Sequence, residues 1–160
     1  FMNKKRTLLI SVTISLFLVG YMTFAFINAM NFQSNSIVVP QNKAVLVTPK
    51  GNIELELAQT PEQQMYGLMN RTSLDLNKGM IFMFSNEETR SFWMKDTLIS
   101  LDMIFLNKDF KVVKIHKSTL PNQTEQTYYS EQSSQYVIEL NGGATNTFLI
   151  QEGDTLQIKF

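Results

Sequence analysis

The sequence predicts a mainly β domain, a compact β-sandwich or partly closed barrel with one short helix, preceded by a separate N-terminal apolar helix. Two observations lead to this prediction. Short runs that alternate apolar and polar residues, separated by turn residues, recur throughout residues 43–160. Residues 8–27, in contrast, form one uncharged apolar stretch with the length of a membrane-spanning helix.

Three basic residues, at positions 4–6, directly precede the apolar stretch. The positive-inside rule places this end in the cytoplasm and everything after the stretch outside. We therefore expect a single-pass protein of the cell membrane, with residues 1–27 as signal anchor, 28–42 as linker and 43–160 as extracytoplasmic domain. Because a secretory signal begins in the same way, cleavage to a secreted or periplasmic domain is the alternative.

The composition excludes several classes of function. The chain has no cysteine, so disulfides, thiol chemistry and cysteine-type zinc sites are excluded. From residue 41 onward 11 basic and 14 acidic residues give a net charge of −3, which does not favour a nucleic-acid partner. The expected partners are the membrane, through the N-terminal helix, and an envelope protein or a small-molecule ligand.

The domain begins with the clearest local signals. Residues 44–47 and 53–57 flank a Pro-Lys-Gly-Asn turn, which predicts a hairpin. Thr60 before a proline, with a glutamine three positions later, predicts a helix start, and Gly67 predicts its end. Further strands are expected over residues 80–84, 91–94, 101–106, 111–116, 136–140 and 155–160, with a polar loop over 121–134 and one helical turn over 144–149.

No catalytic constellation is present. His116 is the single histidine, and strand alternation predicts that it faces solvent. The sequence has no nucleophile elbow, zincin helix, Walker loop, dinucleotide fingerprint or calcium loop. We therefore assign no catalytic residue and expect no cofactor.

A group of polar residues inside the apolar middle of the domain is the main candidate for a site. A strand through Phe92 and Met94 would place an indole and an ammonium side by side on its other face. Such a pair can stack on and hold an anionic or sugar-like ligand, whereas the structural alternative is an exposed aromatic beside an ion pair. The candidate ligand-binding residues are Arg71, Trp93, Lys95, Asp96, Thr97 and Asp102.

Asp102 is the least explained charge of this group. It shares a strand face with Ile104 and Leu106, so we expect its carboxylate either to stand at the end of the strand or to have a buried partner. Arg71 and Lys95 are the nearest candidates for that partner.

Two further interpretations remain open. Methionine is crowded between residues 65 and 103, and thioethers select Cu(I), so a copper site is one alternative and core packing the other. Its ligands would be Met69, Met80, Met94 and His116. The third interpretation is a hydrolase in which Asp102 or Asp96 acts as base and Lys95 steadies the developing negative charge.

A set of short motifs resembles one family. They are GLMNR at 67–71, GMIFMF at 79–84, FWMKDT at 92–97, LDMIF at 101–105, VIEL at 137–140 and Gly-Asp at 153–154. In this order they are similar to the domain of unknown function (DUF) 192 family of small bacterial and archaeal proteins. The resemblance spans about residues 45–160 and implies a jelly-roll-like β-sandwich with one short helix, without an established activity.

The resemblance also marks positions by motif match: Gly67, Met69, Arg71, Gly79, Met80, Trp93, Met94, Lys95, Thr97, Asp102 and Glu139. Two departures stand out, because Asp96 occupies a position where the family usually has Asn, and Asn141 one where Pro is common. We therefore expect a membrane-anchored extracytoplasmic domain that acts as a non-catalytic binding module.

Overall fold

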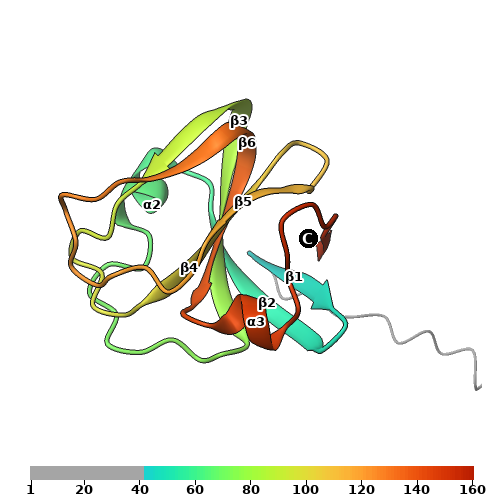
Figure 1. The fold of residues 1–160 in the computed structure, drawn as a ribbon, viewed down its shortest axis with the longest axis horizontal. Helices are drawn as coiled ribbons and strands as arrows, with labels where there is room; N and C mark the ends of the chain where they lie inside the picture. The colour runs from blue at the N-terminus through green and yellow to red at the C-terminus, as the bar shows by residue number, and fades with distance from the viewer. Residues whose placement is uncertain (1–41) are drawn as a thin grey trace, which may run out of the picture. The chain divides into compact units, whose positions relative to one another are not determined.

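The computed structural model describes residues 42–160, which form a mainly β domain (Figure 1). The predicted membrane helix and most of the predicted linker lie outside the described residues. Within the described part no helix has the length and apolarity needed to cross a bilayer. The elements are β1 Lys43–Thr48, β2 Gly51–Ala58, α2 Pro61–Tyr66, β3 Lys78–Phe92, β4 Leu101–Leu106, β5 Val112–His116, β6 Tyr128–Asn141, α3 Ala144–Thr147 and β7 Gln157–Lys159.

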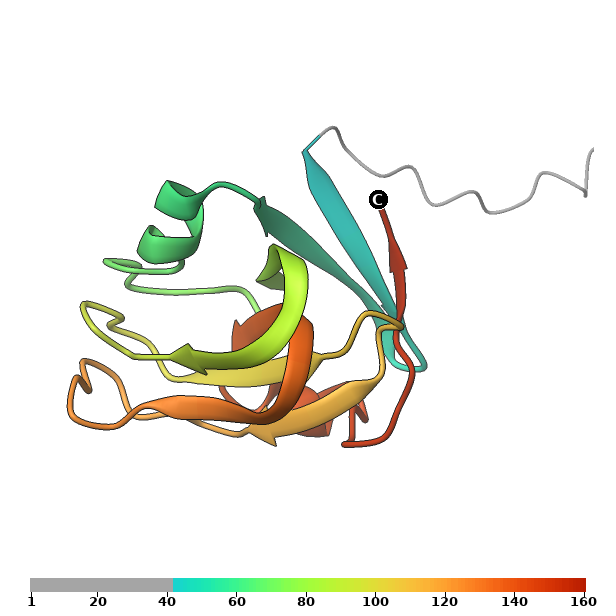
Figure 2. The same ribbon diagram turned by 90° about the horizontal axis from the view of Figure 1, so that it is seen from above.

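The prediction of a mainly β domain is confirmed, and the structure corrects the arrangement of its strands. Instead of two packed sheets, the strands form one seven-stranded sheet in the order β5-β4-β6-β3-β2-β1-β7. The sheet is strongly curled, with β3 and β6 bending together as a ribbon (Figure 2). Its two edges approach where Lys111 of the β4–β5 turn bridges to Thr155, before β7. The result is a curled half-barrel with two short helices: α2 is the predicted helix, and α3 lies where one helical turn was expected over residues 144–149.

The local signals at the start of the domain are confirmed. β1 and β2 pair as the expected antiparallel hairpin. α2 begins with a complete capping box, in which the Thr60 side chain accepts from the Gln63 backbone and the Gln63 side chain accepts from the Thr60 backbone. α2 ends at Gly67, and the chain then crosses over so that β3 runs parallel to β2. Figure 1 shows α2 beside β3, and the Gln64 amide donates to the Met83 carbonyl.

Two predicted boundaries were wrong. The strands expected over 80–84 and 91–94 belong to one long strand, β3, which ends at Phe92. The polar loop expected to reach residue 134 ends earlier, because β6 starts at Tyr128 and pairs with the far part of β3. Both errors have one cause. The polar part of β3 and the polar part of β6 are strands only because they pair with each other, and no local sequence pattern predicts that pairing.

The sheet is covered on both faces. One face carries an aliphatic cluster that includes Leu55, Ile104 and Ile138, and α3 with the chain that follows it packs over this cluster. The opposite face carries a second cluster, in which Phe82 and Phe105 are joined by residues of the 68–74 segment. Both clusters are fully buried at their centres. The candidate site lies at the border of the second cluster.

Candidate functional site

One row of residues crosses five strands, β2, β3, β6, β4 and β5, on the face of the second cluster. Glu56 lies opposite Met80, Met80 opposite Glu139, Glu139 opposite Met103, and Met103 opposite His116. Residues opposite one another in a sheet share a face, so these five side chains follow one another across it. Glu139 therefore has a methionine on each side.

Glu139 is a buried carboxyl group without a hydrogen-bond donor among the described residues. Its side chain is 5 % exposed. Burial raises the pKa of Glu139 to about 8, and the positive charge of Arg71 lowers it only in part. The oxygens of this carboxyl group open onto a pocket, where water or a polar group of a ligand can supply the missing hydrogen bond.

The Glu139 carboxyl group lies at the end of a small inner pocket of about 30 Å³. The end of α2, β3, and the loop after β3 form its walls. Gly67 is essential to this space, because a Cβ atom there would lie 3.2 Å from the Phe82 ring and 3.9 Å from Glu139 Oε2. Its φ of 49° with ψ of −128° is also a conformation reserved for glycine. The lining residues are Gln64, Met65, Tyr66, Gly67, Leu68, Met69, Phe82, Phe92, Trp93, Thr97 and Glu139.

An outer pocket of about 370 Å³ shares the side chains of Met65, Tyr66, Met69 and Trp93 with the inner one. Its surface is mostly apolar, and it is completed by Pro61, Glu62 and Lys95. Tyr66 and Trp93 remain 56 % and 48 % exposed, which is unusual for aromatic side chains that flank a pocket. The inner and outer pockets together are called the cleft below.

Trp93 and Lys95 lie side by side as predicted, but the element that carries them differs from the prediction. β3 ends at Phe92, so both residues lie in the loop that follows it rather than in a strand. The Lys95 ammonium lies 5.5 Å from the centroid of the Trp93 ring, a cation–π arrangement at the mouth of the cleft.

Arg71 is paired, though not with the predicted residue. Both of its terminal nitrogens donate to the two carboxylate oxygens of Glu56, at 2.6 and 2.7 Å. These hydrogen bonds lower the pKa of Glu56. The pair lies beside a third pocket, which shares Tyr66 and Gly67 with the inner one. Arg71 therefore lies near Glu139 with its strongest donors already used.

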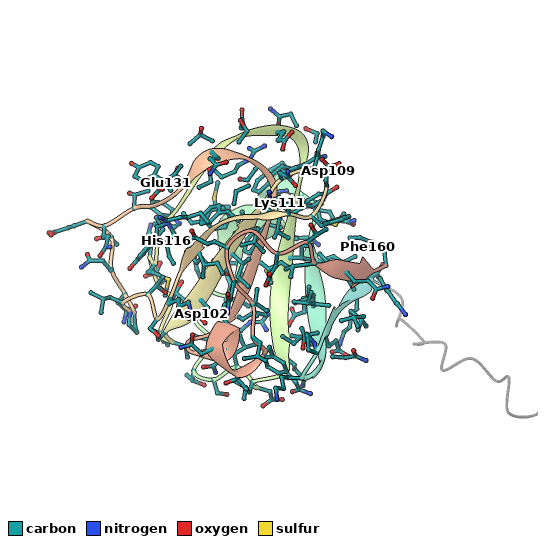
Figure 3. The ribbon with its side chains drawn as sticks, turned by 45° about the vertical axis from the view of Figure 1, so that its right-hand side comes forward. Asp102, Asp109, Lys111, His116, Glu131 and Phe160 are labelled. Atoms are coloured by element: carbon teal, nitrogen blue, oxygen red, sulfur yellow. The ribbon has the colours of Figure 1, made fainter. Side chains whose placement is uncertain are left out.

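The prediction that Arg71 or Lys95 partners Asp102 was wrong. Asp102 is fully buried at the start of β4, beside α3 (Figure 3). Its carboxylate accepts hydrogen bonds from the backbone N–H groups of Ser118, Gly143 and Thr145 at 2.8 to 3.0 Å, and from the Thr145 hydroxyl at 2.6 Å. Four neutral donors satisfy the charge, so Asp102 joins α3 and the end of β5 to the sheet and has no oxygen left for a ligand.

Asp96 and Thr97 form the turn of the loop. Asp96 is exposed with a φ of 53°, and its carbonyl accepts from the Asn70 backbone at 2.7 Å. Asparagine and aspartate are the residues that best tolerate this left-handed conformation, which explains why either amide or acid can stand at this position. Thr97 is buried in the wall of the inner pocket, and its hydroxyl donates to the Lys95 carbonyl.

The four copper-ligand candidates are not brought to one point. The Met94 sulfur is buried and accepts a hydrogen bond from Thr119. Met80 and His116 lie three strands apart in the row described above, which corresponds to about 14 Å. His116 is also half-buried rather than facing solvent, since its ring packs against Phe105.

The structure thus brings together part of the predicted site and adds to it. Trp93, Lys95 and Thr97 border the cleft, Arg71 lies next to it, and Asp96 supports its loop from outside. The aspartates needed for a hydrolase do not meet there, because Asp102 is engaged with α3. The interpretation from the residues did not select Glu139 or Tyr66. A single glutamate between Ile138 and Leu140 in an apolar strand was the available signal.

The comparisons with known proteins establish the family. The DUF192 family model, described as "Uncharacterized ACR", matches residues 45–158. The chain belongs to the DUF192 family. No curated protein matches it significantly.

Two solved structures are similar to this DUF192 domain. One is a proposed transcription regulator from Sinorhizobium meliloti 1021, with 31 % identity and a TM-score of 0.66, covering 77 % of this chain and 97 % of its own. The other is a protein of unknown function from Novosphingobium aromaticivorans DSM 12444, with 30 % identity and a TM-score of 0.65, covering 78 % and 94 %.

Proposed function

We propose that this DUF192 domain is a non-catalytic binding module whose site is the cleft, and that its ligand is a small sugar-like molecule. The observation that carries the proposal is the Glu139 carboxyl group, buried without a donor at the end of a pocket with exposed aromatic walls. Apolar walls around a few convergent polar groups are the usual composition of a small-ligand site.

The outer pocket supports a ring-shaped ligand. Its volume of about 370 Å³ falls within the range of about 300 to 1,000 Å³ typical of ligand sites. The C–H face of a sugar ring is apolar and packs on an aromatic face such as that of Trp93 or Tyr66, while its hydroxyl groups need hydrogen-bond partners. Glu139 and the Thr97 hydroxyl, at the inner end, are such partners.

An anionic ligand fits this cleft less well than the sequence suggested. Arg71, the strongest anion-binding side chain nearby, is held in a bidentate pair with Glu56. The inner pocket ends at a carboxyl group, and Glu62 adds another at the outer rim. We therefore retain the sugar-like ligand, and we favour a small molecule over an envelope protein because the inner pocket admits only a small group.

We further propose that the domain acts outside the cytoplasm on a membrane anchor. The support comes from the sequence alone: three basic residues at 4–6, followed by twenty uncharged residues at 8–27. Without protease, the protein should be recovered in the membrane fraction. Protease added to intact spheroplasts should then digest the domain without prior lysis. Protection of the domain until lysis would contradict the topology, and recovery in the medium would indicate cleavage.

The binding proposal is tested by the fluorescence of Trp93, the only tryptophan of the chain. The purified full chain is titrated with glucose, N-acetylglucosamine, glucosamine and maltose, and saturable changes in emission are expected for at least one of them. Tyr66→Ala should weaken that binding at least fivefold, because Tyr66 lines both pockets. Tyr129→Ala is the matched control, since Tyr129 is 52 % exposed but does not line the cleft.

Two results would contradict the proposal. One is an emission spectrum that does not respond to any of these sugars, confirmed by calorimetry. The other is equal loss of binding in both tyrosine variants, which would place the ligand elsewhere.

A further inference from the structure

The inner pocket accepts one small chemical group. A volume of about 30 Å³ holds a water-sized group and is too small for a sugar ring. The candidates with hydrogen-bonding capacity are therefore a hydroxyl group or an ammonium group of the ligand, with the remainder of the ligand in the outer pocket. The two differ in charge and in the number of hydrogen bonds that they donate.

The ionised form of Glu139 would favour a positive group in the inner pocket. Glu139 lies at its end, and the last turn of α2, whose carbonyl groups carry partial negative charge, lies along its wall. The side chains on either side of Glu139 in the sheet, Met80 and Met103, are neutral.

The ionisable groups around Glu139 leave its charge without a close partner. Arg71 is the cation that acts on it, and Arg71 makes its hydrogen bonds to Glu56. The remaining ionisable group in the wall is the phenol of Tyr66. His116 lies in the same row two strands away and contacts the Tyr129 carbonyl. Lys95 stands at the outer mouth, on the Trp93 ring.

We propose that the inner pocket binds a primary ammonium group next to Glu139, so that the ligand of the cleft is an amino sugar. The inference rests on the proposed function and specifies the ligand class of the same site. The ammonium donates to the Glu139 carboxylate and to acceptors in the wall, while the ring packs on Trp93 and Tyr66. The ammonium of the exposed Lys95 lies over the Trp93 ring in the free domain, so the sugar ring would take its place there.

Binding of an ammonium group requires the ionised form of Glu139. Because burial keeps Glu139 protonated in the free protein near neutral pH, the carboxyl group releases its proton to the solvent when the ammonium enters. The ion pair replaces the neutral acid, and no other bond changes. Close to one proton per bound ligand should therefore be released at pH 6.5.

The test compares ligands that differ at one position. The full chain is titrated at pH 6.5 with glucosamine, glucose and N-acetylglucosamine, which carry an ammonium, a hydroxyl or an amide group at the same carbon. Glucosamine should bind more tightly than the other two, which requires its ion pair with Glu139 to outweigh a cost of roughly thirtyfold for releasing the Glu139 proton at this pH. Calorimetry in buffers of different ionisation enthalpy measures the released proton.

Two glutamate variants locate the effect. Glu139→Gln should remove the proton release and the preference for glucosamine, so that this variant binds glucosamine and glucose with equal affinity. Glu62→Gln removes a carboxylate from the outer rim and should leave the preference within about twofold. Cadaverine, an ammonium compound without a sugar ring, should bind more weakly than glucosamine because it cannot stack on Trp93.

The outcomes separate the two proposals. Binding of all three sugars with equal affinity would overturn the ammonium assignment and leave the binding module intact. The ammonium assignment would also be overturned if Glu62→Gln removed the preference for glucosamine and Glu139→Gln did not. The ammonium group would then bind at the outer rim, next to Glu62. Tighter binding of cadaverine than of glucosamine would replace the sugar by an aliphatic amine. A cleft that binds none of these compounds would overturn both proposals.

Discussion

Replacing Glu139 by glutamine should change how the stability of the domain depends on pH. The pKa of Glu139 is about 8 in the folded domain, against an ordinary value of 4.5. The folded state therefore binds more protons than the unfolded state between these two values, and the free energy of unfolding falls as the pH rises through this range. The stability linked to the protonated acid is fully present below pH 4.5 and is lost by about pH 8.

The magnitude follows from the two pKa values. One pH unit corresponds to about 1.4 kcal/mol per proton, so the loss reaches about 3 kcal/mol at pH 7 and about 4 to 5 kcal/mol above pH 8. Glu139→Gln has no titrating group at this position, so its stability should lack this slope. The amide of Glu139→Gln would also be buried without a hydrogen-bond partner. At low pH the free energy of unfolding of the variant should therefore be equal to or lower than that of the wild type. The informative quantity is the change of that difference with pH.

Urea unfolding followed by Trp93 emission, at pH 5 to 9, measures this quantity. All other ionisable groups are the same in the two proteins, so their contribution cancels in the difference. Glu131→Gln is the matched control: Lys114 donates to Glu131 and lowers its pKa, so the contribution of Glu131 to stability is constant above pH 4.5 and is lost only below it. A difference between wild type and Glu139→Gln that stays constant from pH 5 to 8 would show that Glu139 ionises like a surface carboxyl group, and its burial at the end of the inner pocket would be refuted.

The remaining predictions concern residues that shape the site. Asp102→Asn should lower the free energy of unfolding by about 3 kcal/mol in urea titrations, because one carboxylate oxygen becomes a donor facing N–H and O–H donors. Asp96→Asn should alter the free energy of unfolding by less than about 0.5 kcal/mol, because Asp96 is an exposed turn residue. Equal effects at the two positions would contradict the assignment of Asp102 as a buried structural carboxylate. Thr60→Ala should cost about 1 kcal/mol through the loss of the α2 cap, seen as a lower urea midpoint with an unchanged slope. Gly67→Ala should cost about 2 kcal/mol or more and also weaken sugar binding, whereas loss of stability without loss of binding would separate Gly67 from the pocket.

Several features of the domain are determined by nearby residues, and these were predicted from the sequence. The β1–β2 hairpin follows from a turn between two alternating runs, and the α2 start follows from a capping box of four consecutive residues. The face on which Asp102 lies follows from the period of two, which places it with Ile104 and Leu106. The family follows from short motifs in a fixed order.

Other features depend on partners distant in the sequence. The polar halves of β3 and β6 are strands only because each supplies hydrogen bonds to the other across about 40 residues. The donors to Asp102 are Ser118 and residues 143–145, which are distant in the sequence. Residues 143–145 lie beside Asp102 because β6, the strand before them, pairs with β4. Asn141, a departure from the family pattern, donates to the Leu74 carbonyl and so ties the segment after α2 to the sheet.

The sequence by itself determined the class of the domain and its local turns and caps, whereas Trp93 and Lys95 were expected in a strand and lie in the loop after β3. Only the tertiary structure decided which charge is satisfied and which is not. Alternation along a strand tells which side of the sheet a residue faces, but not what covers that side. The Asp102 carboxylate faces four donors, three at the start of α3 and one at Ser118, whereas Glu139 lines the inner pocket beside Gly67. That difference in covering makes the first carboxylate structural and the second the candidate ligand contact.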